Sequence, residues 1–497
     1  MPFSPEVLLL LTILVPAGAV LGILATDRSP NVREGVTIVA SLILIALVTS
    51  LYNLVSSGTV VELPGPELFP GLSLSFSIEP LGMLFSLVAG YLWLVTTVYA
   101  IGYMRGHEEE NQTRFYACFA VAISSVMGIA YADNLFTLFI FYEVLTLSTY
   151  PLVTHAGTAK AKQGGRVYLG VLLTTSILFL LLAIIGTWFS AGTLDFVAGG
   201  IFPDEVPMVV TGTLLVLFIF GIGKAAIMPF HRWLPAAMVA PTPVSALLHA
   251  VAVVKAGVFT VMKVCVYIFG LDLLQLLPTT EVMLYLAAAT VILSSLVAMR
   301  QDNLKARLAY STVSQLSYIT VGALLATSAG VVGGTMHIAM HAFGKITLFF
   351  CAGAIMVASH KTEISQMRGL GRQMPLTMVA FFIGSLSIIG LPPTGGTWSK
   401  WYLMIGAVDT ERWLIMMTLM LSSLLNIAYL LPIPIRAFLD KADGEQAKPA
   451  RIKEAPLPCL IAIAVTCTGC FILFFYTQPL FELASALLEA SGQAYGR

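Results

Sequence analysis

Five lysines lie inside long apolar stretches of the sequence, where a charged side chain is unexpected: Lys224, Lys255, Lys263, Lys345 and Lys400. A lysine near the centre of a bilayer is energetically costly, and such residues by default belong to an ion or proton pathway. Lys263 allows a simpler interpretation, which we favour for it, because it lies near the end of its stretch and could extend to the lipid headgroups. The other four are candidate proton carriers.

One acid, Glu143, also lies deep inside an apolar stretch, in the segment FTLFIFYEVLTLSTYPLVTH. A carboxyl group at that depth is expected to be protonated or paired with a positive charge, because burial disfavours its ionised form. We interpret Glu143 as a functional acid. The alternative is a neutral acid that is hydrogen-bonded to Ser148 or to a neighbouring helix.

Two of the lysines lie beside residues that interrupt a helix. Lys224 is in FIFGIGKAAIMPFHRWLP and Lys400 is in SIIGLPPTGGTWSKWYL, and the glycines and prolines of both segments disfavour an unbroken helix. A broken helix at membrane depth is tolerated only where it lines a wet cavity or is buried in protein, and transporters place ion sites at such breaks. The alternative for both is a lysine that reaches the headgroups from near a kink.

A stripe of titratable residues follows in MHIAMHAFGKITLFF, where His337, His341 and Lys345 recur every four residues and therefore share one helix face. Histidine titrates nearest neutrality, so the stripe is suited to passing protons. Haem or metal ligation is the alternative, but no further ligands with suitable spacing are evident. His249 precedes Lys255 by a spacing that does not share a helix face. We favour Lys255 as the relay residue and leave His249 open between a relay and a packed core histidine.

The composition identifies the environment of these residues. Of the 497 residues, 58% are hydrophobic and only 10% are charged, and the mean hydropathy is +0.90. Such a chain has too few charges to cover a water-facing surface, so we predict an all-α membrane protein without a soluble catalytic domain. The 26 basic and 26 acidic residues balance, which argues against nucleic-acid binding. The six cysteines mostly lie in apolar stretches, and we expect neither a metal nor a cofactor.

The apolar stretches predict about fourteen transmembrane helices. They lie near 5–25, 35–56, 78–103, 115–132, 134–155, 167–190, 207–230, 241–269, 281–299, 308–326, 331–358, 374–406, 413–435 and 456–477. Basic residues collect in every second loop, starting with Arg28 and Arg33, whereas acids collect in the others. By the positive-inside rule both termini should lie on the non-cytoplasmic side, and the first stretch reads as a retained span.

The two interrupted spans are seventh and twelfth in this order, which suggests an internal repeat. We predict four regions: an N-terminal three-helix segment (1–110), a first five-helix repeat (111–270), a second five-helix repeat (271–440), and a cytoplasmic loop with the last span and tail (441–497). Because five is odd, the two repeats would have inverted topology, each with one broken helix.

Five motifs carry these features: YEVLTLSTYPLVTH, FGIGKAAIMPFHRWLPAAMVAPTPVSALLHA, VVKAGVF, HIAMHAFGKITLFF and GLPPTGGTWSKWYL. From about Asn111 to Arg436 the chain closely resembles the antiporter-like subunits shared by Mrp-type multisubunit sodium/proton antiporters, respiratory complex I and membrane-bound hydrogenases. The resemblance implies that Glu143 and Lys224 form a paired charge. It further implies a central hydrophilic axis for protons, made of Lys224, Lys255, His337, His341, Lys345 and Lys400.

Within that family the compact length and the GLPPTGGTWSKWYL segment resemble the D-type Mrp subunit, which we favour. The histidine stripe and the segment from His249 to Lys255 resemble the larger A-type subunit, whose long C-terminal extension this chain lacks. We therefore expect a proton-translocating subunit of a sodium/proton antiporter in the cell membrane, with other membrane subunits as partners. The alternatives are a proton-pumping subunit of a redox-driven complex, such as an NADH:quinone oxidoreductase or a membrane-bound hydrogenase, and, from another class, a stand-alone solute transporter.

Overall fold

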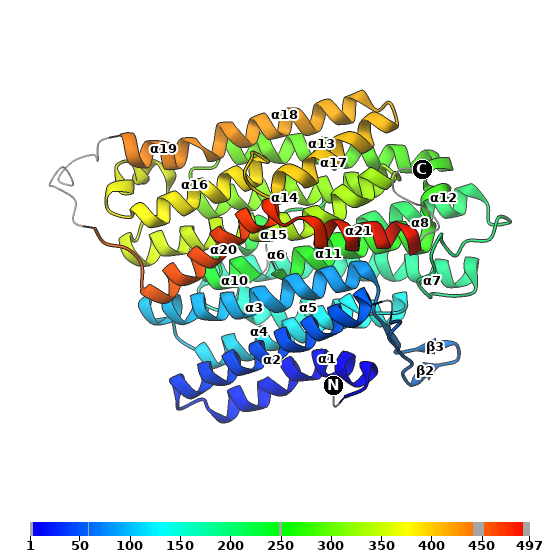
Figure 1. Cartoon of the computed structure of the whole chain (residues 1–497), viewed down its shortest axis with the longest axis horizontal. Helices are drawn as coiled ribbons and strands as arrows, with labels where there is room; N and C mark the ends of the chain where they lie inside the picture. The colour runs from blue at the N-terminus through cyan, green and yellow to red at the C-terminus, as the bar shows by residue number, and fades with distance from the viewer. Residues whose placement is uncertain (1–2, 58, 248–250, 441–451, 491–497) are drawn as a thin grey trace.

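Long helices lie side by side along the long axis of the molecule, with the N-terminal helices at one edge and α18 at the opposite edge (Figure 1). The computed structural model describes residues 3–57, 59–247, 251–440 and 452–490. The N-terminal helices are α1 (Pro5–Ala25), α2 (Pro30–Ser56), α3 (Pro80–Gly106), α4 (Gln112–Ala130) and α5 (Leu135–Val153). The predicted all-α membrane architecture is confirmed.

The middle of the chain is divided into shorter helical pieces. They are α6 (Ala159–Thr175), the π-helical η1 (Ser176–Leu180), α7 (Leu181–Ala191), α8 (Met208–Gly221), the 3₁₀-helical η2 (Gly223–Ala225), α9 (Trp233–Ala236), η3 (Ala237–Val239), α10 (Thr242–Ala246), α11 (Val253–Lys263), the π-helical η5 (Val264–Phe269) and α12 (Leu271–Leu276).

Longer helices resume after this region. They are α13 (Pro278–Arg300), α14 (Leu304–Leu324), α15 (Ser328–Ser359), the short 3₁₀ turns η6 (Ile364–Met367) and η7 (Leu370–Arg372), α16 (Pro375–Ile389), α17 (Gly396–Asp409), α18 (Trp413–Leu430), α19 (Pro432–Leu439), α20 (Leu457–Phe475) and α21 (Gln478–Ala490).

Ten helices among the described residues are long and apolar enough to cross a membrane. The four further stretches that we predicted correspond to α8, to α10 with α11, to α14, and to α16 with α17. Three of these are divided into short pieces, and α14 carries many hydroxyl and amide side chains, so the four do not meet a simple criterion of length and hydropathy. The total of fourteen therefore stays a prediction.

Local sequence rules account for where several helices begin. The side chain of Asn134 accepts a hydrogen bond from the Thr137 backbone N–H at 2.8 Å, and that of Asn303 accepts one from Ala306 at 3.1 Å. Both are N-caps, which satisfy amide groups that the first helical turn leaves free. Prolines occupy the first turn of α1, α2, α3 and α13, where their missing N–H does no harm.

Two small two-stranded sheets that the sequence analysis did not predict lie between α2 and α3. Strands β1 (Glu62–Leu63) and β4 (Phe76–Ser77) pair antiparallel, and so do β2 (Glu67–Phe69) and β3 (Leu72–Ser73). In Figure 1, β2 and β3 project from one end of the helices.

Helix α15 forms the centre of the protein. It packs against α3, α10, α11, α14, α16, α17 and α20, and nearly all of its side chains are buried. The outer helices instead expose large apolar side chains, for example Leu21 on α1, Val39 on α2 and Leu424 on α18. Polar side chains placed on α15 are therefore enclosed by protein on all sides, whereas the apolar exterior suits a lipid environment.

Candidate functional site

The first helix interruption lies at Lys224, as predicted. Helix α8 ends at Gly221, η2 follows, and Ala226 adopts a left-handed backbone conformation with φ 57°. The indole Nε1 of Trp233 donates to the carbonyl oxygen of Gly223 at 2.9 Å, and the backbone N–H of Lys224 donates to the Tyr142 hydroxyl at 3.2 Å. Buried protein groups thus satisfy the backbone at this break, which is one of the two conditions for a broken helix at membrane depth.

The ammonium group of Lys224 is completely buried against α5. It donates to the carbonyl oxygen of Tyr142 at 2.7 Å and to Thr146 Oγ1 at 2.6 Å, and it lies 3.1 Å from the centre of the Tyr142 ring. An aromatic face and two oxygen acceptors stabilise a positive charge that has left water.

Glu143 follows Tyr142 on α5 and is the acid that acts electrostatically on Lys224. Its two carboxylate oxygens are buried and have no hydrogen-bond partner among the described residues, and no ion pair within 4.0 Å joins it to a cation there. Ser148 donates to Leu145 instead, at 3.1 Å. The alternative in which Ser148 bonds Glu143 is therefore not seen among the described residues, and neither a hydrogen bond nor an ion pair joins Glu143 to Lys224 there.

Lys255 and His341 form the most direct contact between two predicted site residues. Lys255 Nζ lies 2.7 Å from His341 Nδ1, and both side chains are buried. Lys255 is on α11 and His341 on α15, two helices that pack together. His249, which we left open between a relay residue and a packed core histidine, lies outside the described residues.

The predicted stripe on α15 continues from His341 to His337. The two imidazole rings are 5.7 Å apart, and His337 Nδ1 lies 2.8 Å from Ser399 Oγ on α17. The ring of Tyr318 stacks on His337 at 5.8 Å. His337 Nε2 is buried and has no hydrogen-bond partner among the described residues, which leaves one ring nitrogen able to exchange a proton with a neighbouring group.

Lys345 belongs to the same helix but points to a different set of partners. Its Nζ donates to Ser311 Oγ at 2.6 Å and to the Leu308 carbonyl oxygen at 3.3 Å, both on α14. The hydroxyl of Tyr429 on α18 also donates to Ser311, at 3.0 Å. Lys345 is therefore connected to the outer helix α18 through one serine.

The second interruption separates α16 from α17, and Lys400 lies beside it. Helix α16 ends at Ile389, and Gly390 has a φ of 90°, a conformation that glycine adopts readily. Lys400 Nζ donates to the Ile389 carbonyl oxygen at 3.0 Å and to Ser423 Oγ at 3.2 Å, and it lies 4.7 Å from the centre of the Tyr318 ring. A cation at the C-terminus of a helix is favoured by the helix dipole.

Contacts connect four of the predicted residues, Lys255, His341, His337 and Lys400, into one series. Lys255 bonds His341, His341 neighbours His337, and the Tyr318 ring lies between His337 and Lys400. The backbone at Lys224 packs against α11, the helix that carries Lys255, because η2 contacts α11. The ammonium group of Lys224 bonds residues of α5 instead. The sequence analysis missed the polar and aromatic partners, namely Tyr142, Thr146, Tyr318, Ser399, Ser423 and Tyr429. Hydroxyl groups are frequent between packed helices, so no sequence signal separated them from ordinary helix contacts.

The structure corrects our interpretation of Lys263, for which we favoured a side chain that extends to the lipid headgroups. Its side chain is 1% exposed, forms an ion pair with Glu79 at the start of α3, and donates to the Ala132 carbonyl oxygen at 2.6 Å. Its ammonium also lies 4.2 Å from the centre of the Phe196 ring. The interpretation of a lysine that reaches the headgroups is wrong, because the N-cap residue of α3 and two loops enclose the end of α11 and supply a partly buried carboxylate.

A cavity of about 280 Å³ lies where α3 and α15 end and where α10 and α14 begin. Its lining includes His107, Glu109, Lys305 and Lys361. His107 Nδ1 lies 3.1 Å from a carboxylate oxygen of Glu109, and Lys305 Nζ donates to the Ala240 carbonyl oxygen at 2.5 Å. Partial burial lowers the pKa of Lys361. The cavity brings titratable groups next to the segment that precedes Lys255.

No group of three or more histidine, cysteine or acidic side chains among the described residues is arranged to hold a metal ion. All six cysteines are free thiols.

Comparison with known proteins gives a consistent picture. Residues 132–426 match the family described as NADH:quinone oxidoreductase/Mrp antiporter, TM. The chain is 32% identical to the N subunit of NADH-quinone oxidoreductase from Desulforudis audaxviator (strain MP104C), over 83% of this chain and 84% of that protein. It is 33% identical to the A/B subunit of a probable K(+)/H(+) antiporter from Rhizobium meliloti (strain 1021), over 82% of this chain but 40% of that protein.

Two solved structures have the same fold. A chain of the membrane-bound sulfane sulfur reductase, an archaeal respiratory membrane complex, superposes with a TM-score of 0.86 at 21% identity and covers 98% of both chains. A chain of the Mrp complex from Dietzia sp. DQ12-45-1b superposes with a TM-score of 0.85 at 23% identity and covers 99% of this chain and 98% of that one.

Proposed function

Because the chain belongs to the NADH:quinone oxidoreductase/Mrp antiporter transmembrane family, we propose that it is the proton-translocating subunit of a multisubunit sodium/proton antiporter. The observation that carries this proposal is the buried series Lys255, His341, His337, Tyr318 and Lys400. Lysine and histidine exchange protons, and their enclosure by protein keeps the pathway separate from lipid.

In this proposal protons enter through the five-helix unit with one broken helix and leave through the five-helix unit with the other. They pass Lys224, Lys255, the histidines and lysine of the α15 stripe, and Lys400. Glu143 modulates the first carrier: when Glu143 is ionised and close, Lys224 retains its proton, and when the two separate, the buried Lys224 loses it. Support comes from the position of Glu143 on α5, next to Tyr142, whose carbonyl oxygen and ring hold the Lys224 ammonium group. Small movements of α5 against η2 would therefore change the distance between the two side chains.

The topology is part of the same proposal. Two inverted five-helix units, 111–270 and 271–440, would place one interruption each at Lys224 and Gly390. Both termini would lie on the non-cytoplasmic side. In support, Arg33, Arg105 and Arg114 from two separate predicted cytoplasmic loops line a single cavity at one end of the helices.

The decisive experiment measures proton and sodium flux in inverted vesicles that carry the purified complex, without an electron donor. Wild type is compared with Lys224→Ala and with Lys160→Ala, which removes an exposed lysine at the start of α6. We expect sodium-driven proton movement in wild type and Lys160→Ala and none in Lys224→Ala. Equal flux in all three would refute the proposed path.

A second candidate function is a proton-pumping subunit of a redox-driven complex. The near full-length match to the N subunit of an NADH-quinone oxidoreductase favours it. In that case the same vesicles would show no flux until a redox substrate is added, and the purified complex would contain subunits with redox cofactors. The match to a K(+)/H(+) antiporter likewise makes potassium the first cation to test beside sodium.

The branch within the family and the partners follow from these tests. We propose the D-type position in an Mrp complex, with other membrane subunits as partners, and the fold shared with chains of two membrane complexes supports subunit partners. A stand-alone solute transporter would instead transport a substrate as a single purified chain, and its substrate would bind at the midplane among aromatic and polar groups.

A further inference from the structure

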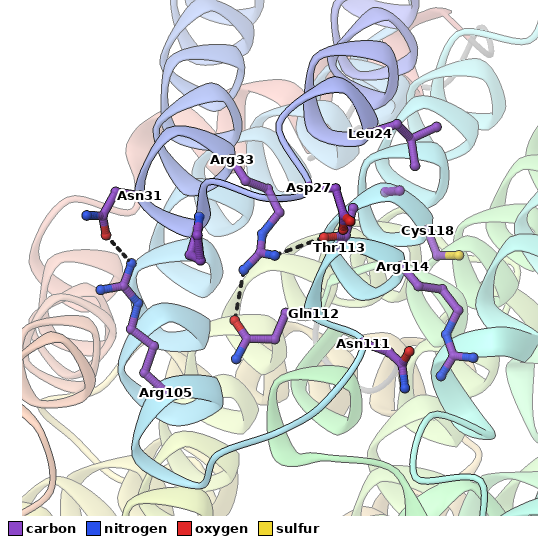
Figure 2. Close-up of a pocket in the computed structure, with 12 residues that line it drawn as sticks. Leu24, Asp27, Asn31, Arg33, Arg105, Asn111, Gln112, Thr113, Arg114 and Cys118 are labelled. Carbon is purple, nitrogen blue, oxygen red and sulfur yellow. Dashed lines mark hydrogen bonds between the residues drawn. The ribbon is translucent and has the colours of Figure 1, made fainter.

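A large cavity outside the proton axis lies where four helix ends meet. It has a volume of about 1070 Å³ and is formed by the end of α1, the start of α2, the end of α3 and the start of α4. Three arginines from three different helices line it, Arg33, Arg105 and Arg114, together with polar and apolar side chains (Figure 2). None of these residues takes part in the proposed path.

Arg33 is the most buried of the three arginines, and several contacts hold its guanidinium group. It is 4% exposed, its Nη1 donates to Thr113 Oγ1 at 2.9 Å and its Nη2 to Gln112 Oε1 at 2.9 Å, and its guanidinium carbon lies 5.3 Å from the centre of the Tyr116 ring. Figure 2 shows the guanidinium held between Gln112 and Thr113. Its Nε is buried and has no hydrogen-bond partner among the described residues. Its Nη2 also lies 4.0 Å from Oε1 of Glu34, so Arg33 holds its position through several contacts at the cavity.

The other two arginines differ in how far they are already paired. Arg105 Nη2 donates to Glu34 Oε2 at 2.5 Å and to Asn31 Oδ1 at 2.6 Å, so one carboxylate largely compensates it. Arg114 is exposed, and its Nη2 donates to the His155 carbonyl oxygen at 3.0 Å. Glu34, which is not in the lining, pairs with both Arg33 and Arg105, and Asp27 is the acid among the lining residues. The cavity lining therefore carries more positive than negative charge.

The surroundings indicate what kind of anion would compensate this charge. The cavity lies at the ends of apolar helices that are long enough to cross a membrane, and Leu24, Ala117 and Cys118 form its apolar wall. Leu24 and Val32 beside it are each 53% exposed, and Leu21 is 74% exposed. The same helix pair α1/α2 carries an apolar groove of about 510 Å³, lined in part by Gly18 and Val36. A ligand with one negative charge and an apolar body fits this arrangement.

We propose that this cavity binds the phosphodiester headgroup of an anionic phospholipid, with Arg33 and Arg114 as the phosphate ligands and the α1/α2 groove along an acyl chain. The planar forks of arginine suit phosphate oxygens, and basic pockets between transmembrane helices on the cytoplasmic side are typical headgroup sites. An acidic segment of a partner protein would also meet the charge requirement, but the exposed apolar side chains around the cavity favour lipid.

Cys118 provides a built-in reporter, because it is a half-buried free thiol in the wall of the cavity. The purified complex is placed in nanodiscs of phosphatidylcholine alone or of phosphatidylcholine mixed with phosphatidylglycerol, and the alkylation rate of Cys118 is measured. Cys467 on α20, also half-buried, is the internal control. We expect phosphatidylglycerol to slow alkylation of Cys118 about tenfold, equivalent to about 1.4 kcal/mol, and to leave Cys467 unchanged.

Variants connect this protection to the arginines. Arg114→Gln and Arg33→Gln should each lose the protection while the complex stays assembled, and Arg300→Gln, which removes an exposed arginine at the end of α13, should retain it. Arg114→Gln alone decides the matter if Arg33→Gln fails to assemble, because Arg114 is exposed. Because the readout is thiol protection and not transport, it is independent of the proposed transport function.

Three outcomes would overturn the proposal. Equal Cys118 rates in the two nanodisc compositions would exclude selective binding of anionic lipid. Equal protection by inorganic phosphate added to phosphatidylcholine nanodiscs would assign the site to free phosphate. Slow alkylation in both lipid compositions, together with a crosslink from Cys118 to another chain of the complex, would assign the cavity to a protein segment.

Discussion

Lys255 Nζ and His341 Nδ1 lie 2.7 Å apart between α11 and α15, so two predicted proton carriers on different helices are hydrogen-bonded to each other. Among the described residues, the contact connects the segment after the first interruption to the stripe on the central helix. A lysine donor and an imidazole acceptor at this distance can share a single proton, so in the proposed path both residues would carry the proton from one helix to the other.

Lys255→Ala and His341→Ala should each lower proton flux about a hundredfold or more, the scale on which a positioned proton donor acts. The double variant should lose no more than either single variant, because the two side chains act as one unit. Flux in vesicles of equal complex content measures this, with Lys160→Ala as the control. Additive losses would mean that the two residues act independently.

Glu143→Ala and Lys224→Ala should each abolish transport while the complex still assembles. Removal of the carboxylate leaves Lys224 with only its uncharged partners, Tyr142 and Thr146, and no longer with an acid that modulates its proton affinity. Size-exclusion chromatography establishes assembly, and vesicle flux establishes transport. Wild-type flux in both variants would eliminate the proposed axis.

The Lys263–Glu79 ion pair should contribute to stability. Either Lys263→Met or Glu79→Gln leaves a buried group without its partner and should destabilise the protein by about 3–5 kcal/mol. The double variant should recover part of this loss, because no charge is then left unpaired. Thermal unfolding of the purified complex measures the three variants. An equal or larger loss in the double variant would contradict the buried pair.

Gly390→Ala should destabilise the second interruption and disturb Lys400. The position has a φ of 90°, and an added Cβ would lie 2.7 Å from Lys400 Cδ. The backbone conformation alone should cost about 1–2 kcal/mol. Gly170→Ala on α6 is the matched control, since a Cβ there meets nothing within 4 Å. We expect a lower unfolding temperature and reduced flux only in Gly390→Ala, and equal effects in both would contradict the assignment.

His155, which follows the end of α5, should make stability depend on pH. Burial is the main cause that lowers the pKa of its imidazole from the ordinary value of 6.5. The unfolded chain therefore binds a proton more readily, so the contribution to stability is present above pH 6.5 and is lost as the pH falls below it. His155→Asn should flatten the unfolding temperature in this window relative to wild type. An unchanged pH profile would exclude the role.

The positions of the functional residues could be predicted because local rules govern them. A lysine in an apolar stretch is conspicuous in any sequence, and the glycines and prolines around Lys224 and Lys400 predicted the helix interruptions at these two residues. The spacing of His337 and His341 was sufficient to place them on one helix face, where their rings are neighbours. These properties depend on a few consecutive residues, so the chain alone determines them.

The partners of these residues were decided only by tertiary structure. Lys263 was misinterpreted because its partner Glu79 lies on a helix far away in the sequence, and Tyr318 gave no signal of its position between His337 and Lys400. Such contacts depend on the depth and rotation at which helices pack, which are set by the whole bundle and not by the pattern of any one segment. The sequence by itself therefore determined a membrane protein with lysines and histidines inside its spans, and the packing decided which of these side chains meet.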